Sequence, residues 1–130
     1  MSRNKNRIYL AFYSRSKHDD YHMALLVSPK IPNPKDKDTS RLHAMNRANP
    51  SRQILHHWHY EAAICYGRTE RISALCLLNK TQKNGEEISE VLRFIELVQD
   101  DPNWNCKSWA FSAIGASQAS CISSLLGHII

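Results

Sequence analysis

The chain has 130 residues, of which 42% are hydrophobic, and this composition fits one folded domain with a modest core rather than a disordered chain. Its formal net charge is +5, from 17 Lys and Arg against 12 Asp and Glu. The basic residues are scattered and do not alternate with aromatic ones, so we do not expect a nucleic-acid partner. We treat residues 1–130 as a single domain.

The first part of the chain predicts β-strands. Short aliphatic, aromatic and β-branched runs, separated by polar or proline-containing stretches, are typical of strands. The run from Met23 to Val27 is continuously apolar, so we expect its strand to lie inside the sheet, covered on both faces. We expect residues 1–6 to be disordered. The predicted strands are 7–13, 21–28, 41–47, 52–62 and 71–79.

After residue 84 the period of the apolar residues becomes helical. The stretch "GEEISEVLRFIELVQ" predicts a helix over 86–98, with two acidic residues in its first turn. The polar break "DDPNWN" follows, and a second helix is predicted to begin near Asn105, which is a suitable N-cap. Strands followed by helices predict an α+β domain with a mostly antiparallel sheet of about five strands and two helices.

Cys106, in "PNWNCKSW", is the first candidate for chemistry. If Asn105 caps the second helix, Cys106 lies in its first turn, where backbone N–H groups and the helix dipole favour a thiolate. Such a thiolate still needs a base to become a catalytic nucleophile. The remaining cysteines lack this context, and we interpret them as small packing residues: Cys65, Cys76 and Cys121.

His22 is the best candidate for that base. It lies in the apolar strand "YHMALLV" and shares a face with Ala24 and Leu26, so we expect it to point inward. The alternative is a core histidine bonded to a backbone carbonyl. His43, in "RLHAMN", could orient the His22 ring, and Asn46 could substitute in that role. The alternative for His43 is a half-exposed strand histidine.

The stretch "HHWHYE" raises the possibility of a metal site. His57 and His59 share a strand face and could bind zinc together with Cys65 or Glu61. Two histidines at i and i+2 without a second, well-spaced ligand pair are a weak metal motif. We therefore expect no metal and no cofactor.

Segments for targeting or membrane insertion are not expected. The apolar run from Ile8 to Tyr13 is too short for a signal sequence, and no stretch of 18 apolar residues occurs. The four cysteines contain no C-x-x-C pair. We expect free thiols in a reducing, cytoplasmic location.

Four segments carry a resemblance to known proteins: "YLAFYSRSK", "YHMALLVSPK", "WHYE" and "QDDPNWNCKSW". Together, over residues 7–113, they resemble a fungal family of small uncharacterised proteins. "YHMALLVSPK" and "NCKSW" also resemble motifs of the circularly permuted papain-like cysteine enzymes, such as the lecithin retinol acyltransferase-like and PPPDE-like proteins, which place histidine before cysteine. Residues 114–130 depart from the expected pattern.

This resemblance implies a permuted papain-like fold and acyl chemistry. Cys106 would be the nucleophile and His22 the base, with His43 orienting that base. Trp104, Asn105 and Trp109 would contact a small-molecule or peptide substrate bearing an amide, ester or thioester. Water would complete hydrolysis, and an amine or alcohol would complete acyl transfer.

Two other functions agree with the same residues. The first is a binding or scaffold protein that keeps the fold without turnover, since a fold does not fix a function. The second is a tailoring enzyme that acts on a natural-product intermediate. Labelling of Cys106 by an acyl probe near neutral pH, lost on His22→Ala, would separate an enzyme from a binding protein.

Overall fold

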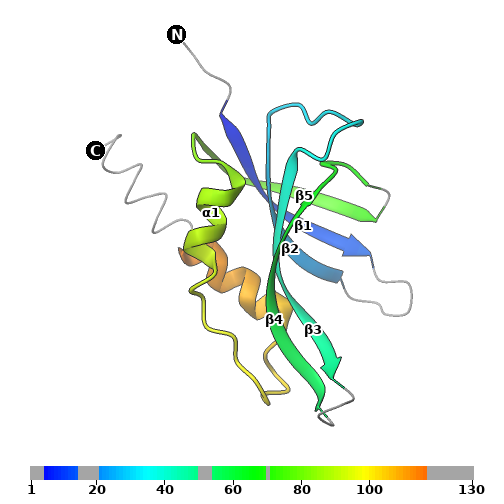
Figure 1. Cartoon of the computed structure of the whole chain (residues 1–130), viewed down its shortest axis with the longest axis vertical. Coiled ribbons are helices and arrows are strands. Elements are labelled where there is room, and N and C mark those ends of the chain that lie inside the picture. The colour runs from blue at the N-terminus through cyan, green and yellow to red at the C-terminus, as the bar shows by residue number, and fades with distance from the viewer. Residues whose placement is uncertain (1–4, 15–20, 50–53, 70, 117–130) are drawn as a thin grey trace.

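The computed structural model describes residues 5–14, 21–49, 54–69 and 71–116, and these form an α+β domain. Figure 1 shows one antiparallel sheet with the strand order β4-β3-β2-β1-β5 and helices after it. The predicted fold class is confirmed at this level. The strands are β1 (Asn6–Ser14), β2 (Tyr21–Ser28), β3 (Thr39–Asn49), β4 (Ile54–Cys65) and β5 (Ile72–Thr81).

β2 is the central strand, as its apolar run predicts. It pairs with β1 along its whole length, from Ser14 opposite Tyr21 to Arg7 opposite Ser28. All residues from Ala24 to Ser28 are buried, so both faces of β2 are covered at this end. His22 lies nearer the start of the strand, where it is half-buried. The sequence therefore correctly placed His22 on a rigid, interior element.

The sheet opens between β2 and β3. Within the described residues, these strands pair only over Leu25–Val27 and Ser40–Leu42, whereas β3 and β4 pair along almost their entire length. Figure 1 shows the β3–β4 ribbon bending away from β1 and β2 beyond this short contact. His22 lies on the part of β2 beyond this short ladder with β3.

Two helices cover one face of this sheet. Helix α1 (Gly85–Leu92) begins with a capping box, in which the Asn84 side chain accepts from the Glu87 N–H and the Glu87 side chain accepts from the Asn84 N–H. The second described helix spans residues 106–116. Both helices contribute buried side chains to a core shared with β1, β2 and β3; this core includes Ile8, Leu10, Leu25, Val27, Leu42, Ile88, Leu92 and Trp109.

Helix α1 is shorter than its sequence pattern predicts, because it ends at Leu92 and not at residue 98. After this point the chain runs beside the edge strand β4. There the Gln99 side chain accepts from the Trp58 N–H at 2.9 Å and donates to the Trp58 carbonyl at 3.0 Å. Ile95 and Leu97 pack on the core from this segment. Tertiary bonds to β4 therefore replace the last helical turns.

Of residues 1–6, which we expected to be disordered, residues 1–4 lie outside the described residues and Asn6 is ordered in a strand. Asn6 is the first residue of β1, and its Nδ2 donates to the Lys83 carbonyl at 2.9 Å. At the other end, the helix reaches residue 116, and the remainder of the atypical segment 114–130 lies outside the described residues. Within the described part of the chain, no helix is both long enough and apolar enough to span a membrane.

Trp109 is expected to be a main contributor to stability. Its side chain is fully buried and its ring lies 5.7 Å from that of Tyr60, centroid to centroid. Trp109→Ala should lower the free energy of unfolding by about 3–5 kcal/mol, since a large cavity remains. Urea denaturation followed by circular dichroism measures this. Trp104→Ala is the matched control, because Trp104 is only half-buried, and an equal loss in both variants would contradict the expectation.

Candidate active site

The helix that carries the candidate nucleophile begins as the sequence predicts. The Asn105 side-chain oxygen accepts from the backbone N–H of Lys107 at 2.9 Å and of Ser108 at 3.4 Å. In return, the Asn105 N–H donates to Ser108 Oγ at 3.1 Å. Asn105 is thus the N-cap, and Cys106 is the first helical residue. The positive end of the helix dipole therefore lies at the residue that carries the thiol.

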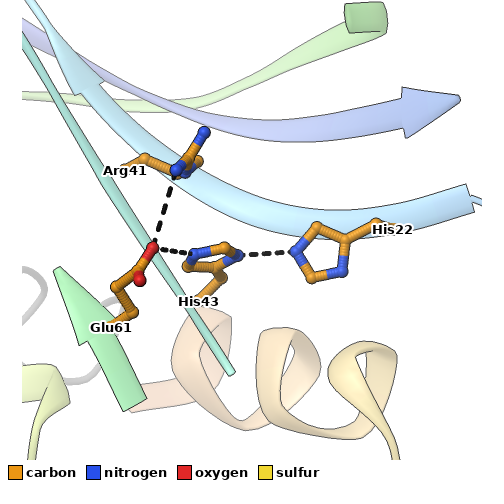
Figure 2. A network of polar contacts seen from close by, with 4 residues as sticks. All are labelled: His22, Arg41, His43 and Glu61. Atoms are coloured by element: carbon orange, nitrogen blue, oxygen red, sulfur yellow. Dashed lines mark hydrogen bonds and ion pairs between the residues drawn. The ribbon is translucent and has the colours of Figure 1, made fainter. Parts of the chain in front are cut away.

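Three side chains from neighbouring strands form a chain of hydrogen bonds (Figure 2). His22 Nε2 lies 2.6 Å from His43 Nδ1, and the other nitrogen of His43, Nε2, lies 2.9 Å from Glu61 Oε1. The same carboxylate oxygen lies 3.5 Å from a terminal nitrogen of Arg41. His43 is buried, so its ring is held between the two partners. His43 therefore has the orienting position that we predicted for it or for Asn46.

If both rings are neutral, these contacts determine where each imidazole carries its proton. An ionised carboxylate can only accept, so His43 donates its Nε2–H to Glu61. In a neutral His43 the Nδ1 atom is then an acceptor, and His22 donates its Nε2–H to it. The lone pair of a neutral His22 is consequently on Nδ1. Figure 2 shows this second ring nitrogen on the edge of His22 that faces the helix.

Cys106 and the histidine chain line one cleft of about 1000 Å³. The cleft occupies the space where β3 leaves β2, and its lining includes His22, His43, Asn105 and Cys106. This volume is at the upper end of the range for small-molecule sites. We expected a nucleophile in the first helical turn to be partly exposed, but Cys106 is only 2% exposed and forms part of the cleft floor. The predicted nucleophile and base therefore meet in the same cavity.

The two tryptophans are not cleft walls, contrary to our expectation. Trp109 lies nearly one helical turn after Cys106, on the helix face that packs against the sheet. Its side chain is therefore part of the core and not of the cleft wall. Trp104 packs edge-to-face on Trp58, with ring centroids 5.4 Å apart, and it is Trp58 that lines the cleft. The apolar wall therefore comes from β4. Asn105 does line the cleft, as expected.

The residues of the alternative zinc site have other partners. His57 Nδ1 lies 3.1 Å from His59 Nε2 on β4, while Glu61, a proposed third ligand, accepts from His43. In the described part of the chain, no three His, Cys, Asp or Glu side chains form a group that could hold a metal ion. Glu61, one of the two further ligands considered, therefore contacts His43 and not the histidine pair.

Within the described residues, no disulfide involves Cys65, Cys76 or Cys106. Cys65 is half-buried, and burial raises the pKa of its thiol, although the nearby Arg41 guanidinium lowers it. A raised pKa means that Cys65 is protonated, and hence a poor nucleophile, at neutral pH. Cys76 lies exposed on β5, away from the cleft lining. These two cysteines are therefore internal references for the reactivity of Cys106.

Sequence reasoning missed the role of Glu61, which we had considered only as a zinc ligand. The structural feature that reveals this role is strand pairing: Glu61 lies opposite His43 in the β3–β4 register. Directly opposed side chains on one sheet face interact. The register itself, however, depends on the pairing of two strands and is not visible in the pattern of either strand alone.

One family comparison covers nearly the entire chain. The model of a family of unknown function, DUF6914, matches residues 5–127. The chain belongs to this family. No curated protein and no solved structure is significantly similar to the chain. The match includes all the elements of the candidate site, from β1 to the helix that begins at Cys106.

Proposed function

We propose that this protein is a cysteine-dependent hydrolase or acyltransferase that acts on an amide, ester or thioester. The observation that carries the proposal is the hydrogen-bonded chain His22–His43–Glu61, which lines or adjoins the same cleft as a cysteine at a helix N-terminus. This arrangement provides a nucleophile, a base and a residue that orients the base, the three parts that nucleophilic catalysis needs. The resemblance to permuted papain-like enzymes supports the same assignment.

In the first half of the reaction, His22 Nδ1 takes the proton of the Cys106 thiol. The thiolate sulfur attacks the carbonyl carbon and forms a C–S bond, and the carbonyl π electrons move to oxygen. When the tetrahedral intermediate collapses, the bond to the leaving group breaks and His22 returns its proton to that group. The product is a thioester on Cys106, with no net change in oxidation state.

In the second half, the acceptor is water, an amine or an alcohol. His22 removes a proton from the acceptor as it attacks the thioester carbonyl, and the C–S bond then breaks to release the acyl product. The proton on His22 returns to the sulfur. His43 keeps its bond to His22 Nε2 throughout, because that nitrogen carries a proton in both the neutral and the charged ring.

The negative charge that develops on the carbonyl oxygen requires donors in the cleft. The helix N-terminus at Asn105–Cys106 brings the positive end of its dipole to this position, while cap side chains already accept from the Asn105, Lys107 and Ser108 N–H groups. Burial of Cys106 at the cleft floor removes water from the reacting atoms, and this strengthens such interactions. The same burial restricts access to substrates that enter through the cleft.

A direct test uses 4-nitrophenyl acetate as an acyl donor at pH 7. We expect a mass increase of one acetyl group per chain and a peptide map that places it on Cys106. Cys65→Ser and Cys76→Ser should label like the wild type, because one thiol is kept protonated by its raised pKa and the other lies away from the cleft lining. Cys106→Ser should abolish the rapid labelling.

Two other results of the acetylation experiment would change the proposed function. If the acetyl group is found equally on Cys65, Cys76 and Cys106, Cys106 has no special reactivity and the family fold serves as a binding or scaffold module. If Cys106 is acetylated but the adduct persists, the missing partner is the acceptor. A panel of amines, including amino-bearing natural-product precursors, would then distinguish acyl transfer or tailoring from hydrolysis.

A further inference from the structure

Part of the cleft lining differs in chemical character from Cys106 and the histidines. Its charged lining residues are Arg41 and Arg71, and no Asp or Glu lines it within the described residues. Tyr13, Ser14 and Thr69 add hydroxyl groups to this part. By contrast, the part that holds Cys106 includes Trp58 and the histidines. A ligand that spans the cleft therefore meets an acyl-reactive part and a cationic, hydroxyl-rich part.

The cationic part is fixed to the sheet by the backbone. The Ser14 N–H donates to the Arg71 carbonyl at 2.9 Å, and the Ile72 N–H donates to the Thr69 carbonyl at 3.2 Å. Tyr13 is paired with His22 on one side and with Ile72 on the other. The start of β5 thus lies two strand spacings, about 10 Å, from the backbone of His22. This separation sets the approximate length of a ligand that reaches both parts.

Arg41 has capacity to bind an anion. Its guanidinium contacts Glu61 at 3.5 Å and hydrogen-bonds the Tyr13 side chain, and its Nε atom is buried with no hydrogen-bond partner. A guanidinium group offers five N–H donors in a planar fork that matches a carboxylate. Burial raises the pKa of the neighbouring Tyr13, so its hydroxyl stays protonated and can donate. The overall net charge of +5 favours the approach of anions.

We propose that the substrate carries a carboxylate, which Arg41 and Arg71 bind while its acyl carbonyl lies at Cys106. This inference rests on the proposed function for the acyl group, whereas the carboxylate site depends only on the lining of the cleft. The carboxylate belongs either to a small dicarboxylic acid derivative or to a peptide. In both cases several bonds separate it from the reacting carbonyl, as the spacing of the two parts requires.

The test measures binding in Cys106→Ser, so that it does not depend on a reactive thiol. Two matched pairs are titrated by calorimetry and by NMR: the monoamide of suberic acid against octanamide, and acetyl-trialanine with a free against an amidated C-terminus. We expect at least one charged member to bind roughly tenfold more tightly than its neutral partner, as charge-assisted hydrogen bonds to arginine provide. The member that does so identifies a small-molecule or a peptide source.

Arginine variants decide whether the preference comes from the cationic part of the cleft. Arg71→Gln in the Cys106→Ser background should reduce the preference to less than about twofold, and Arg41→Gln should weaken it similarly. Arg93→Gln is the matched control, because Arg93 lies exposed beside Glu90 on the α1 side of the fold. The preference should survive in that control, with an unchanged circular dichroism spectrum in all variants.

Two results would overturn the proposal: no preference for either charged probe, including no binding at all, or a preference that persists in both cleft arginine variants. Failure of the proposed acyl chemistry has a different signature. In that case the charged probes still bind Cys106→Ser in an arginine-dependent manner, while wild-type protein is not acetylated at Cys106. The carboxylate site would then belong to a binding protein.

Discussion

Replacing His22 with alanine is expected to slow the acetylation of Cys106 at pH 7 by about 100- to 10,000-fold, which is the usual contribution of general acid–base catalysis. His22 lines the same cleft as Cys106, and its Nε2 is engaged by His43, so its Nδ1 is the atom that can accept the thiol proton. The pseudo-first-order rate of adduct formation, followed by intact-protein mass spectrometry, measures the effect.

His59→Ala is the matched control for this change. His59 is an exposed β4 histidine whose ring nitrogen contacts His57, so its loss removes an imidazole without touching the His22–His43–Glu61 chain. Its acetylation rate should remain within about twofold of the wild type, as for other surface changes. An unchanged rate in His22→Ala, in a variant that remains folded, would show that Cys106 does not use this base. The binding or scaffold function would then be preferred.

Replacing Glu61 with glutamine is expected to reduce the acetylation rate by about 10- to 100-fold, as removal of an outer orienting group typically does. Glutamine has the same shape as glutamate, but its amide can donate as well as accept. With glutamine at position 61, His43 can carry its proton on either ring nitrogen. When His43 carries it on Nδ1, His22 must accept at Nε2, and its lone pair is then no longer on Nδ1. The loss arises from a wrong tautomer and not from a missing side chain.

Long-range ¹H–¹⁵N NMR spectra of the histidine rings test this cause separately from activity. In the wild-type protein we expect the neutral His22 and His43 rings both to carry the proton on Nε2, and Glu61→Gln should yield a mixture of tautomers. If His43 were instead an imidazolium in the ion pair with Glu61, it would donate from Nδ1, and His22 would carry its proton on Nδ1. That spectrum would contradict the assigned role of His22 as the base.

The sequence by itself determined the local elements of the site. Apolar runs and alternation predicted five strands, and the unbroken run from Met23 to Val27 predicted that β2 is central, because an interior strand is covered on both faces. Asn105 predicted the start of the second helix, since capping depends on residues only two or three positions away. Cys106 followed directly from that cap. These features share one property: their causes lie within one turn or one strand.

The tertiary structure alone decided which side chains meet. Glu61 bonds to His43 through the β3–β4 register, and His43 reaches His22 across the point where β3 leaves β2. Gln99 ends the helical pattern early because it binds the backbone of Trp58, 41 residues away. Trp109 enters the core, not the cleft, because of where its helix packs on the sheet. Each of these contacts joins segments that are distant in the sequence. Their free energy comes from burial and hydrogen bonding between different elements, and the residue pattern within a single element does not reveal it.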